Sequence, residues 1–480
     1  MASLYNEQRC ISDFKASLHY LFDSAQIPYV ENRRKKPHYD ARFLFFSGLG
    51  AGLGTMSQDF HYIGHRYGYG ADTLFGIQTV DRRQHVYIIG KTGSGKTTLL
   101  RNLIVQHIAA GHGVGVIDPH GDLADELLDQ IPSHRTRHVV SFNPSDRDFP
   151  IGLNLLGNVA PDDRHLIASG IVSAFKSIWR DSWGPRMEYI LYNALAALLD
   201  CDGATLLGVS RMLVDAGYRQ WVVRQIQDPF VKAFWTDEFE NYDERFAREA
   251  ISPIQNKSGQ FFTNPPMRNI LGQVQSKVDF RFVMDNERIF IANLSKGKLG
   301  EDKANLLGSL LTTQFQLAAM SRAYIPEHAR RDFFLFIDEF HNFTTDSFAS
   351  ILSEARKYRL NLTLSHQYIA QLPLPIRDAV FGNVGTLVSF RIGSTDAVVM
   401  EREFGDALRA SQFTDLDKYE IIFKPLVDGL SGDPFKGRTL TPISNHCGRK
   451  QMMIEQSRAR FSTPREAVEK KIRAWLARKF

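Results

Sequence analysis

One stretch, residues 86–105, limits more than any other what this chain can fold into. It reads VYIIGKTGSGKTTLLRNLIV. Its first four residues are β-branched or aromatic, which predicts a short buried strand, and its last eight have helical periodicity. Between them, residues 90–97 fit the pattern G-x-x-x-x-G-K-[ST] without a mismatch. A glycine loop between a strand and a helix is the context of a P-loop, so this stretch predicts that the chain binds a nucleoside triphosphate.

The chemistry of the loop indicates which residues would hold the nucleotide. Glycines let backbone N–H groups surround phosphate oxygens, and the helix that follows adds the positive end of its dipole. We expect Lys96 to reach the β- and γ-phosphates and the Thr97 hydroxyl to bind Mg²⁺. ATP and Mg²⁺ are therefore the predicted cofactors. The predicted nucleotide contacts are Gly90, Lys91, Thr92, Gly93, Ser94, Gly95, Lys96, Thr97 and Thr98.

A second strand pattern supplies the predicted hydrolytic groups. Residues 333–337 are apolar, and Asp338 and Glu339 follow them directly. In that position we expect Asp338 to hold Mg²⁺, directly or through water, and Glu339 to orient and polarise the attacking water. The paired carboxylates favour hydrolysis over a simple switch, because a switch protein lacks the general-base carboxylate. The chain is therefore predicted to be an ATPase.

Three polar side chains beyond this pair complete the predicted site. Gln367 follows the strand pattern of residues 360–365, where a polar side chain can touch both the γ-phosphate and the water. Arg356, on a predicted helix over 351–359, and Arg391, at the end of a strand over 386–391, are candidate arginine fingers for a neighbouring subunit's site. The alternatives are a solvated helix face for Arg356 and a structural ion pair for Arg391.

Two further polar clusters admit both a functional and a structural interpretation. Lys296 and Lys298 lie in a glycine-flanked loop, LSKGKLG, which either contacts nucleic acid in the channel of a ring or is a solvated connection. His120 and Asp122 follow a strand that ends at Asp118. They are either catalytic or metal-binding residues or, as the neighbouring proline and glycine favour, the turn and N-cap of the next helix.

The order of these patterns predicts an α/β protein. From residue 81 strands alternate with helices, which indicates a mainly parallel sheet. Residues 184–283 show helical spacing with few strand signals, so an all-α subdomain is expected as an insert between the two parts of the core, 81–183 and 284–450. Residues 1–80 form a small N-terminal region that opens with a helical pattern and a basic run at 33–36. A C-terminal helix is expected over 451–480.

Composition adds weaker limits. The 480 residues carry a net charge of +5 and give a pI of about 8.9, which permits a nucleic acid partner without demanding one. The three cysteines, Cys10, Cys201 and Cys447, are far apart and indicate neither a disulfide framework nor a metal site. No signal peptide or membrane-spanning segment is predicted. We therefore expect a soluble protein of the cytoplasm.

Together the motifs resemble those of the HerA–FtsK superfamily of ring ATPases, and most closely the TraD/TraG-like type IV secretion coupling proteins. The resemblance runs from about residue 70 to the C-terminus in the expected order. The segments that carry it are GKTGSGKTTLL, IDPHGDL, FNPSD with GLNLL, SWGPRMEYIL, IANLSKGKLGED, FLFIDEFHNF, EARKYRLNLTLSHQYIAQL and SFRIGSTDA.

This resemblance implies a RecA-like motor core that assembles as a hexamer and pumps DNA through its pore. By position, Lys96 and Thr97 match the Walker A pair, and Asp338 and Glu339 match the Walker B pair. Gln367 matches the sensor glutamine, and Arg356 matches the proposed arginine finger. Conjugative coupling proteins usually begin with transmembrane helices, and none is predicted from this sequence. The possible partners are a relaxosome, a secretion channel or a nuclease, and such partners could recruit the chain to the inner face of the membrane. The alternative function is an ATP-gated scaffold that moves no DNA.

Overall fold

A computed structural model describes residues 60–68, 71–405, 408–443 and 447–480 of the chain. The helical pattern and the basic run expected before residue 60 lie outside these ranges. Within them, one sheet has the strand order β2-β1-β13-β10-β9-β3-β8-β7-β4-β6-β5, and β11 and β12 pair separately. The strands are β1 (Phe60–Gly68), β2 (Ala71–Gln78), β3 (Val86–Ile89), β4 (Gly113–Asp118), β5 (Val139–Phe142), β6 (Ile289–Asn293), β7 (Phe333–Ile337), β8 (Leu360–His366), β9 (Thr386–Ser389), β10 (Glu420–Lys424), β11 (Leu426–Val427), β12 (Leu430–Ser431) and β13 (Phe435–Thr439).

The helices follow the strands along the chain, except for one long series between β5 and β6. The helices are α2 (Lys96–Ala109), α3 (Asp122–Asp129), α4 (Arg164–Ile178), α5 (Pro185–Leu199), α6 (Leu207–Val214), α7 (Ala216–Val223), α8 (Pro229–Ala233), α9 (Glu244–Phe262), α10 (Pro265–Leu271), α11 (Phe280–Asp285), α12 (Lys296–Leu299), α13 (Glu301–Met320), α14 (Phe348–Glu354), α15 (Leu374–Asn383), α16 (Ser394–Phe404), α17 (Ala410–Thr414), α18 (Lys450–Phe461) and α19 (Arg465–Ala477).

The strands from β9 to β5 are all parallel, which confirms the predicted α/β fold class. Every residue of β3, β4, β6, β7 and β8 is buried, as expected of strands covered by helices on both faces. The strand β8 lies between β3 and β7. The carboxyl ends of these three strands therefore meet at one edge of the sheet, where open α/β sheets place their ligand sites.

The other side of the sheet is antiparallel. β10 pairs with β9, β13 with β10, β1 with β13, and β2 with β1. In the β1–β13 pair, Gly64 lies opposite Thr439. The expected boundary at residue 80 therefore divides a single hydrogen-bonded sheet, because β1 and β2 come before it and all other strands after it. Sequence patterns did not reveal this, since the partner of β1 is far away in the chain.

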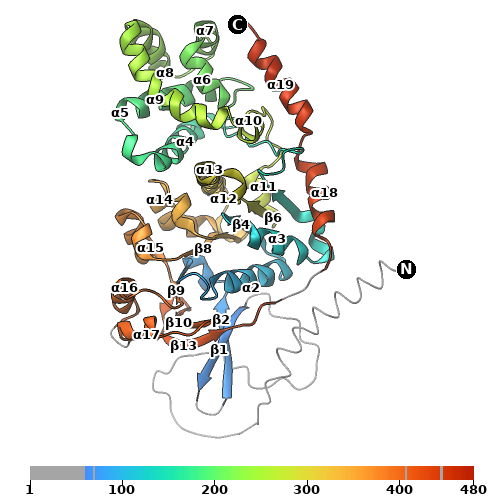
Figure 1. Cartoon of the computed structure of the whole chain (residues 1–480), viewed down its shortest axis with the longest axis vertical. Helices are drawn as coiled ribbons and strands as arrows, with labels where there is room; N and C mark the ends of the chain where they lie inside the picture. The colour runs from blue at the N-terminus through green and yellow to red at the C-terminus, as the bar shows by residue number, and fades with distance from the viewer. Residues whose placement is uncertain (1–59, 69–70, 406–407, 444–446) are drawn as a thin grey trace, which may run out of the picture.

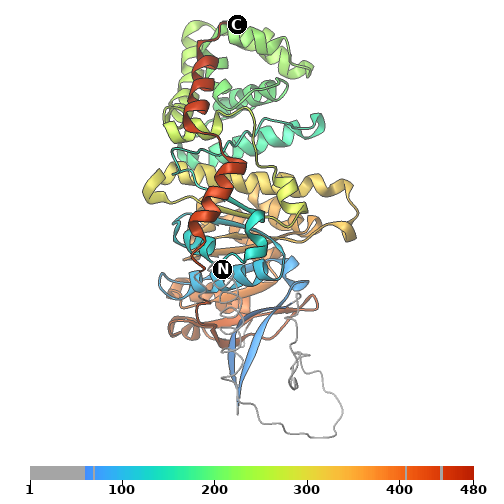
Figure 2. The ribbon, with the colours of Figure 1, turned by 90° about the vertical axis from the view of Figure 1, so that its right-hand side faces the viewer.

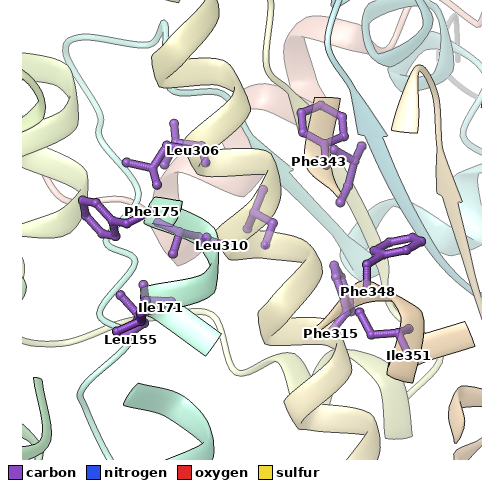
Figure 3. Close-up of a cluster of buried hydrophobic side chains, with 14 of the residues drawn as sticks. Leu155, Ile171, Phe175, Leu306, Leu310, Phe315, Phe343, Phe348 and Ile351 are labelled. Atoms are coloured by element: carbon purple, nitrogen blue, oxygen red, sulfur yellow. The ribbon is translucent and has the colours of Figure 1, made fainter. Parts of the chain in front are cut away.

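The helices from α4 to α10 form a layer that lies beyond the sheet, whereas α11 lies beside α13 next to the sheet (Figure 1). The layer begins with α4, which precedes the start at residue 184 that the sequence suggested. The long helix α13 lies between this layer and the sheet. Figure 3 shows Leu306 and Leu310 of α13 beside Phe175 of α4, with Phe343 and Phe348 on the other side of α13. All five side chains belong to one buried apolar cluster, so the helical layer and the sheet share a core.

Two helices occupy the C-terminal region for which one was expected. The helix α18 ends at Phe461 and α19 begins at Arg465, because Pro464 disfavours helical geometry in Thr463, the residue before it. The helix α18 packs against β5, where the Ser141 N–H donates to Ser457 Oγ over 2.9 Å. The helix α19 packs on the helical layer through Val468 and Ile472. Both views of the molecule show this pair running from the sheet to the helical layer (Figure 2).

Candidate active site

The P-loop lies between β3 and α2, as the sequence predicts. Two of its glycines adopt conformations that other residues rarely take, with φ of 77° at Gly93 and 121° at Gly95. The loop is closed by the Ser94 N–H, which donates to the Lys91 oxygen over 3.2 Å. Lys91, Thr92, Gly93 and Thr97 are exposed and Thr98 is half-buried. The outer side of the loop and the first turn of α2 are therefore open to a ligand.

Lys96 is the first residue of α2, and its side chain turns back under the loop. Only 6% of the residue is exposed, and its Nζ donates to the oxygens of Gly90 (2.5 Å) and Lys91 (3.3 Å). Burial lowers the pKa of Lys96, although the nearby Glu339 and Asp338 act to raise it. The ammonium group thus lies between the loop and two carboxylates, where it can bind the terminal phosphates.

Asp338 and Glu339 follow β7 and lie 5% exposed beside the P-loop. Asp338 is fixed by two hydrogen bonds: its N–H donates to the Ile117 oxygen (3.1 Å), and its Oδ1 accepts from the Glu339 N–H (3.0 Å). Burial, together with the neighbouring Glu339 and Asp118, raises the pKa of Asp338 to about 6. Buried carboxylates that lie this close together favour the binding of a cation.

Glu339 has a left-handed backbone, with φ 46° and ψ 48°. Such strain in a residue other than glycine costs about 1–3 kcal/mol and is concentrated at functional sites. Two side chains hold the strained residue. Asn342 Nδ2 donates to the Glu339 backbone oxygen over 2.8 Å, and Gln367 Nε2 donates to Glu339 Oε1 over 3.0 Å. Gln367 thereby fixes one carboxylate oxygen and leaves the other free.

The free oxygen, Glu339 Oε2, is buried and has no hydrogen-bond partner among the described residues. His341 Nδ1 lies 3.5 Å from it. Burial, reinforced by Lys296, lowers the pKa of His341 to about 4, so this imidazole is neutral at pH 7. An unpaired carboxylate oxygen without a cationic neighbour in contact is a suitable acceptor for the proton of an attacking water.

The site also fits Mg²⁺. Among the described residues, no group of three or more histidine, cysteine and acidic side chains could hold a metal by protein ligands alone. Mg²⁺ is commonly bound through one or two carboxylates together with phosphates of the substrate. Asp338 and the exposed hydroxyl of Thr97 suit this type of coordination, because both lie beside the loop that would hold the phosphates.

The two arginines occupy opposite edges of the sheet. Arg391 follows β9, and its backbone oxygen accepts from the Lys91 N–H over 2.8 Å, so it lies beside its own P-loop. Arg356 lies in the 3₁₀ turn Ala355–Tyr358, before β8, at the amino ends of the parallel strands. Both side chains are exposed. The structure thus brings Arg391 to the site of the same chain and keeps Arg356 away from it.

The segment that contains Lys296 and Lys298 is a helical turn, α12, where the sequence suggested a loop. Its fold follows from the Lys298 and Leu299 N–H groups, which both donate to the Ser295 oxygen over 3.0 Å. Lys298 is exposed. Lys296 instead reaches the segment that follows the hydrolytic pair: its Nζ donates to Asn342 Oδ1 over 2.7 Å and pairs with Glu301 over 2.9 Å.

The residues after β4 have a structural use. Asp118 Oδ1 accepts from the His120 N–H (2.8 Å), and its Oδ2 accepts from the Ala124 N–H (2.9 Å), which ties the start of α3 to the strand. Asp122 is the first residue of that helix. These contacts match the turn and helix-start interpretation of this segment.

Two side chains of the network, Asn342 and His341, were not singled out from the sequence. Both come within three residues of Glu339, in the segment FHNF. The sequence did contain a sign of them: two polar residues between two phenylalanines, since a polar side chain in a buried position needs a hydrogen-bond partner. Their partners could not be foreseen, because Lys296 and Gln371 come from other elements. Gln371 Nε2 lies 3.2 Å from His341 Nε2.

Comparisons with known proteins bear on the family and the fold of the chain. A family model described as the central domain of the helicase HerA matches residues 63–314. No curated protein matches the chain. Among solved structures, it is similar to the plasmid coupling protein TrwB in complex with a non-hydrolysable GTP analogue, with a TM-score of 0.55, 14% identity, and coverage of 78% of this chain and 89% of that one.

The comparison found two further solved structures. One is TrwB in complex with ADP and Mg²⁺, with a TM-score of 0.54, 15% identity, and coverage of 77% of this chain and 89% of that one. The other is VirB4 of Thermoanaerobacter pseudethanolicus, with a TM-score of 0.49, 12% identity, and coverage of 81% and 98%. Among the described residues, no helix is both long and apolar enough to cross a lipid bilayer.

Proposed function

Because the chain belongs to the family of HerA helicase central domains, within the HerA–FtsK superfamily of P-loop ATPases, we propose that it is an ATP-driven motor that moves DNA through the pore of a hexameric ring. The fold is that of TrwB, whose solved complexes contain ATP and GTP analogues and ADP with Mg²⁺. ATP with Mg²⁺ is accordingly the proposed substrate of this chain.

In the proposed reaction, each residue of the site has one task. Lys96 binds the terminal phosphates together with the loop N–H groups, and Thr97 and Asp338 hold Mg²⁺, which neutralises charge on the phosphates. Gln367 orients Glu339, whose free Oε2 accepts the proton of the water that attacks the γ-phosphate. Such proton transfer typically contributes about 10²- to 10⁴-fold to a rate.

One observation carries the proposal from hydrolysis to DNA movement. Lys296 on the basic turn α12 donates to Asn342 Oδ1, and Asn342 donates through Nδ2 to the backbone of the strained Glu339. A DNA phosphate that attracts Lys296 would withdraw it from Asn342 and from Glu301. The basic turn is thereby connected by two hydrogen bonds to the backbone of Glu339, the residue that carries the hydrolytic carboxylate, so DNA contact and hydrolysis can influence one another.

In the proposed ring, the two arginines have different roles. Arg356 is exposed at the amino ends of the strands, and we assign it to the site of a neighbouring subunit in a head-to-tail ring. Arg391 lies beside its own P-loop and serves the same chain's nucleotide. The partners of such a motor in the cytoplasm, or at the inner face of the membrane, would be a relaxosome, a secretion channel or a nuclease.

The test is the ATPase rate of the full chain with and without DNA at increasing salt. We expect several-fold stimulation that declines steeply with salt, because phosphate contacts release counterions. Lys298→Ala should reduce the stimulation and leave the DNA-free rate unchanged, whereas Lys232→Ala, an exposed lysine of the helical layer, should change neither. If DNA does not stimulate hydrolysis at any salt concentration, the alternative of an ATP-gated scaffold is favoured.

A further inference from the structure

We propose that the nucleoside of the bound triphosphate stacks on the ring of Tyr419. This residue lies beside the P-loop, on the side that faces away from Glu339. The residue was not among the predicted nucleotide contacts. The inference rests on the proposed ATPase site, because it needs a triphosphate in the P-loop. It does not depend on DNA movement or on ring assembly.

The direction of the bound nucleotide follows from the order of the strands. Glu339 and Gln367 follow β7 and β8, which lie on one side of the P-loop strand β3. The γ-phosphate must face these residues, because hydrolysis occurs there. The nucleoside is at the other end of the triphosphate and therefore extends toward the side of β9 and β10.

Tyr419 lies at that end, directly before β10. Since β10 is antiparallel to β9, its first residues are at the same sheet edge as the P-loop. The Tyr419 N–H donates to the Ser94 oxygen over 2.9 Å. The aromatic ring contacts the loop itself, because a Cβ atom at Gly95 would be only 2.8 Å from Tyr419 Cδ1. The ring thus lies against the loop just before the first residues of α2.

The backbone of Tyr419 is strained in the same way as that of Glu339. Its φ is 69°, a conformation that a bulky residue adopts only when the surroundings impose it. The Ser94 contact holds it on one side, and the Thr439 N–H, which donates to the Tyr419 oxygen over 2.9 Å, holds it on the other. The fold therefore maintains this ring against the P-loop at an energetic cost, which favours a use for it.

The environment of the ring suits a stacked base. Tyr419 is half-buried, so part of the ring is accessible. Lys418 Nζ lies 5.0 Å from the ring centroid, and this exposed side chain can move aside for a base or turn toward the phosphates. Every nucleobase has a π-face, so stacking distinguishes bases weakly. We therefore expect Tyr419 to bind ATP and GTP with similar affinity.

The experiment compares two ligands on three forms of the full chain in the presence of Mg²⁺. Affinities for ATP and for inorganic tripolyphosphate, which has no nucleoside, are measured by titration calorimetry with wild type, Tyr419→Ala and Tyr419→Phe. Loss of one stacked base typically weakens binding about tenfold. Tyr419→Ala should weaken ATP binding by about this factor and leave tripolyphosphate binding unchanged, while Tyr419→Phe should bind both ligands like wild type.

Three other outcomes are informative. An unchanged ATP affinity in Tyr419→Ala overturns the inference. An equal loss for both ligands also overturns it, because Tyr419 would then act only on the shape of the P-loop. If wild type binds neither ligand, the proposed ATPase site itself is wrong. Tyr324→Ala, which removes a tyrosine that is 88% exposed and far from the loop in the chain, is the matched control and should bind both ligands normally.

Discussion

The two edges of the parallel sheet both bury charged side chains, but they hold them in different ways. At the carboxyl edge, Lys96 lies beside Asp338 and Glu339, and Glu339 Oε2 and Ser94 Oγ have no partner among the described residues. At the amino edge, Arg82 is buried beneath α2. Its Nη1 donates to His107 Nε2 and its Nη2 to Thr363 Oγ1, each over 2.5 Å.

The partners of Arg82 are neutral or aromatic. Its guanidinium lies 5.2 Å from the ring centroids of Phe334 and Phe336, and burial lowers its pKa to about 9. The comparison teaches that burial of a charge does not by itself indicate a reactive site. The carboxyl edge is distinguished by the opposite charges of Lys96 and the carboxylates of Asp338 and Glu339, which lie close to one another. The amino edge uses its cation to join α2, β7 and β8.

The largest expected effect is on hydrolysis and arises at the carboxyl edge. Glu339→Gln keeps the shape of the side chain and removes the base, so the ATPase rate should fall by about 10²- to 10⁴-fold while ATP binding persists. Its unfolding temperature should equal or exceed that of wild type, because one of two crowded carboxylates is gone. Hydrolysis at the wild-type rate would show that Glu339 is not the base. The exposed Glu354→Gln is the control.

A smaller effect, on stability, is expected at the amino edge. Arg82→Met fills similar space but leaves His107 Nε2 and Thr363 Oγ1 without their donor. Buried groups left unsatisfied cost about 1–3 kcal/mol, so the unfolding temperature measured by calorimetry should fall while ATP affinity stays unchanged. Arg83→Met is the matched control: it loses a part-exposed ion pair with Asp332 (2.7 Å) and should change stability little. A stability equal to wild type in Arg82→Met would contradict the structural role.

The smallest expected effect is a pH dependence of stability from the same edge. Burial, with Arg82 nearby, lowers the pKa of His61 to about 2 and that of His107 well below 6.5. At a pH between these lowered pKa values and 6.5, the two histidines are protonated in the unfolded chain but not in the folded chain. Folding stability should therefore decline as pH falls below 6.5, by up to about 1.4 kcal/mol per pH unit for each histidine.

His61→Phe tests this assignment. The ring of His61 stacks on His107 with centroids 3.5 Å apart, and phenylalanine preserves an aromatic ring there without a titratable group. The decrease in unfolding temperature between pH 7.5 and pH 5.5 should be smaller in His61→Phe than in wild type. An identical decrease in both proteins would show that His61 does not contribute.

The sequence predicted those features that depend on local patterns. Residues 86–105 indicated the strand, loop and helix, and the apolar run before Asp338 indicated β7, because each signal lies within one element. The break at Pro464 and the helical turn at Lys296 were missed, although local residues cause them. The contacts of Asn342 with Lys296 and of Tyr419 with Ser94 could not be predicted, since each joins elements that only the sheet topology brings together. The roles of the site residues remain predictions.

The pairing of β1 with β13 has a consequence for how the chain folds. Gly64 and Thr439 come from nearly opposite ends of the described chain, so these strands can meet only after almost all of it has been synthesised. Contacts so distant in sequence form late and slowly. Until then, the edge of β1 that later pairs with β13 exposes unpaired backbone groups, which other chains can bind. The antiparallel side of the sheet is therefore where we expect nascent molecules to be most vulnerable to aggregation.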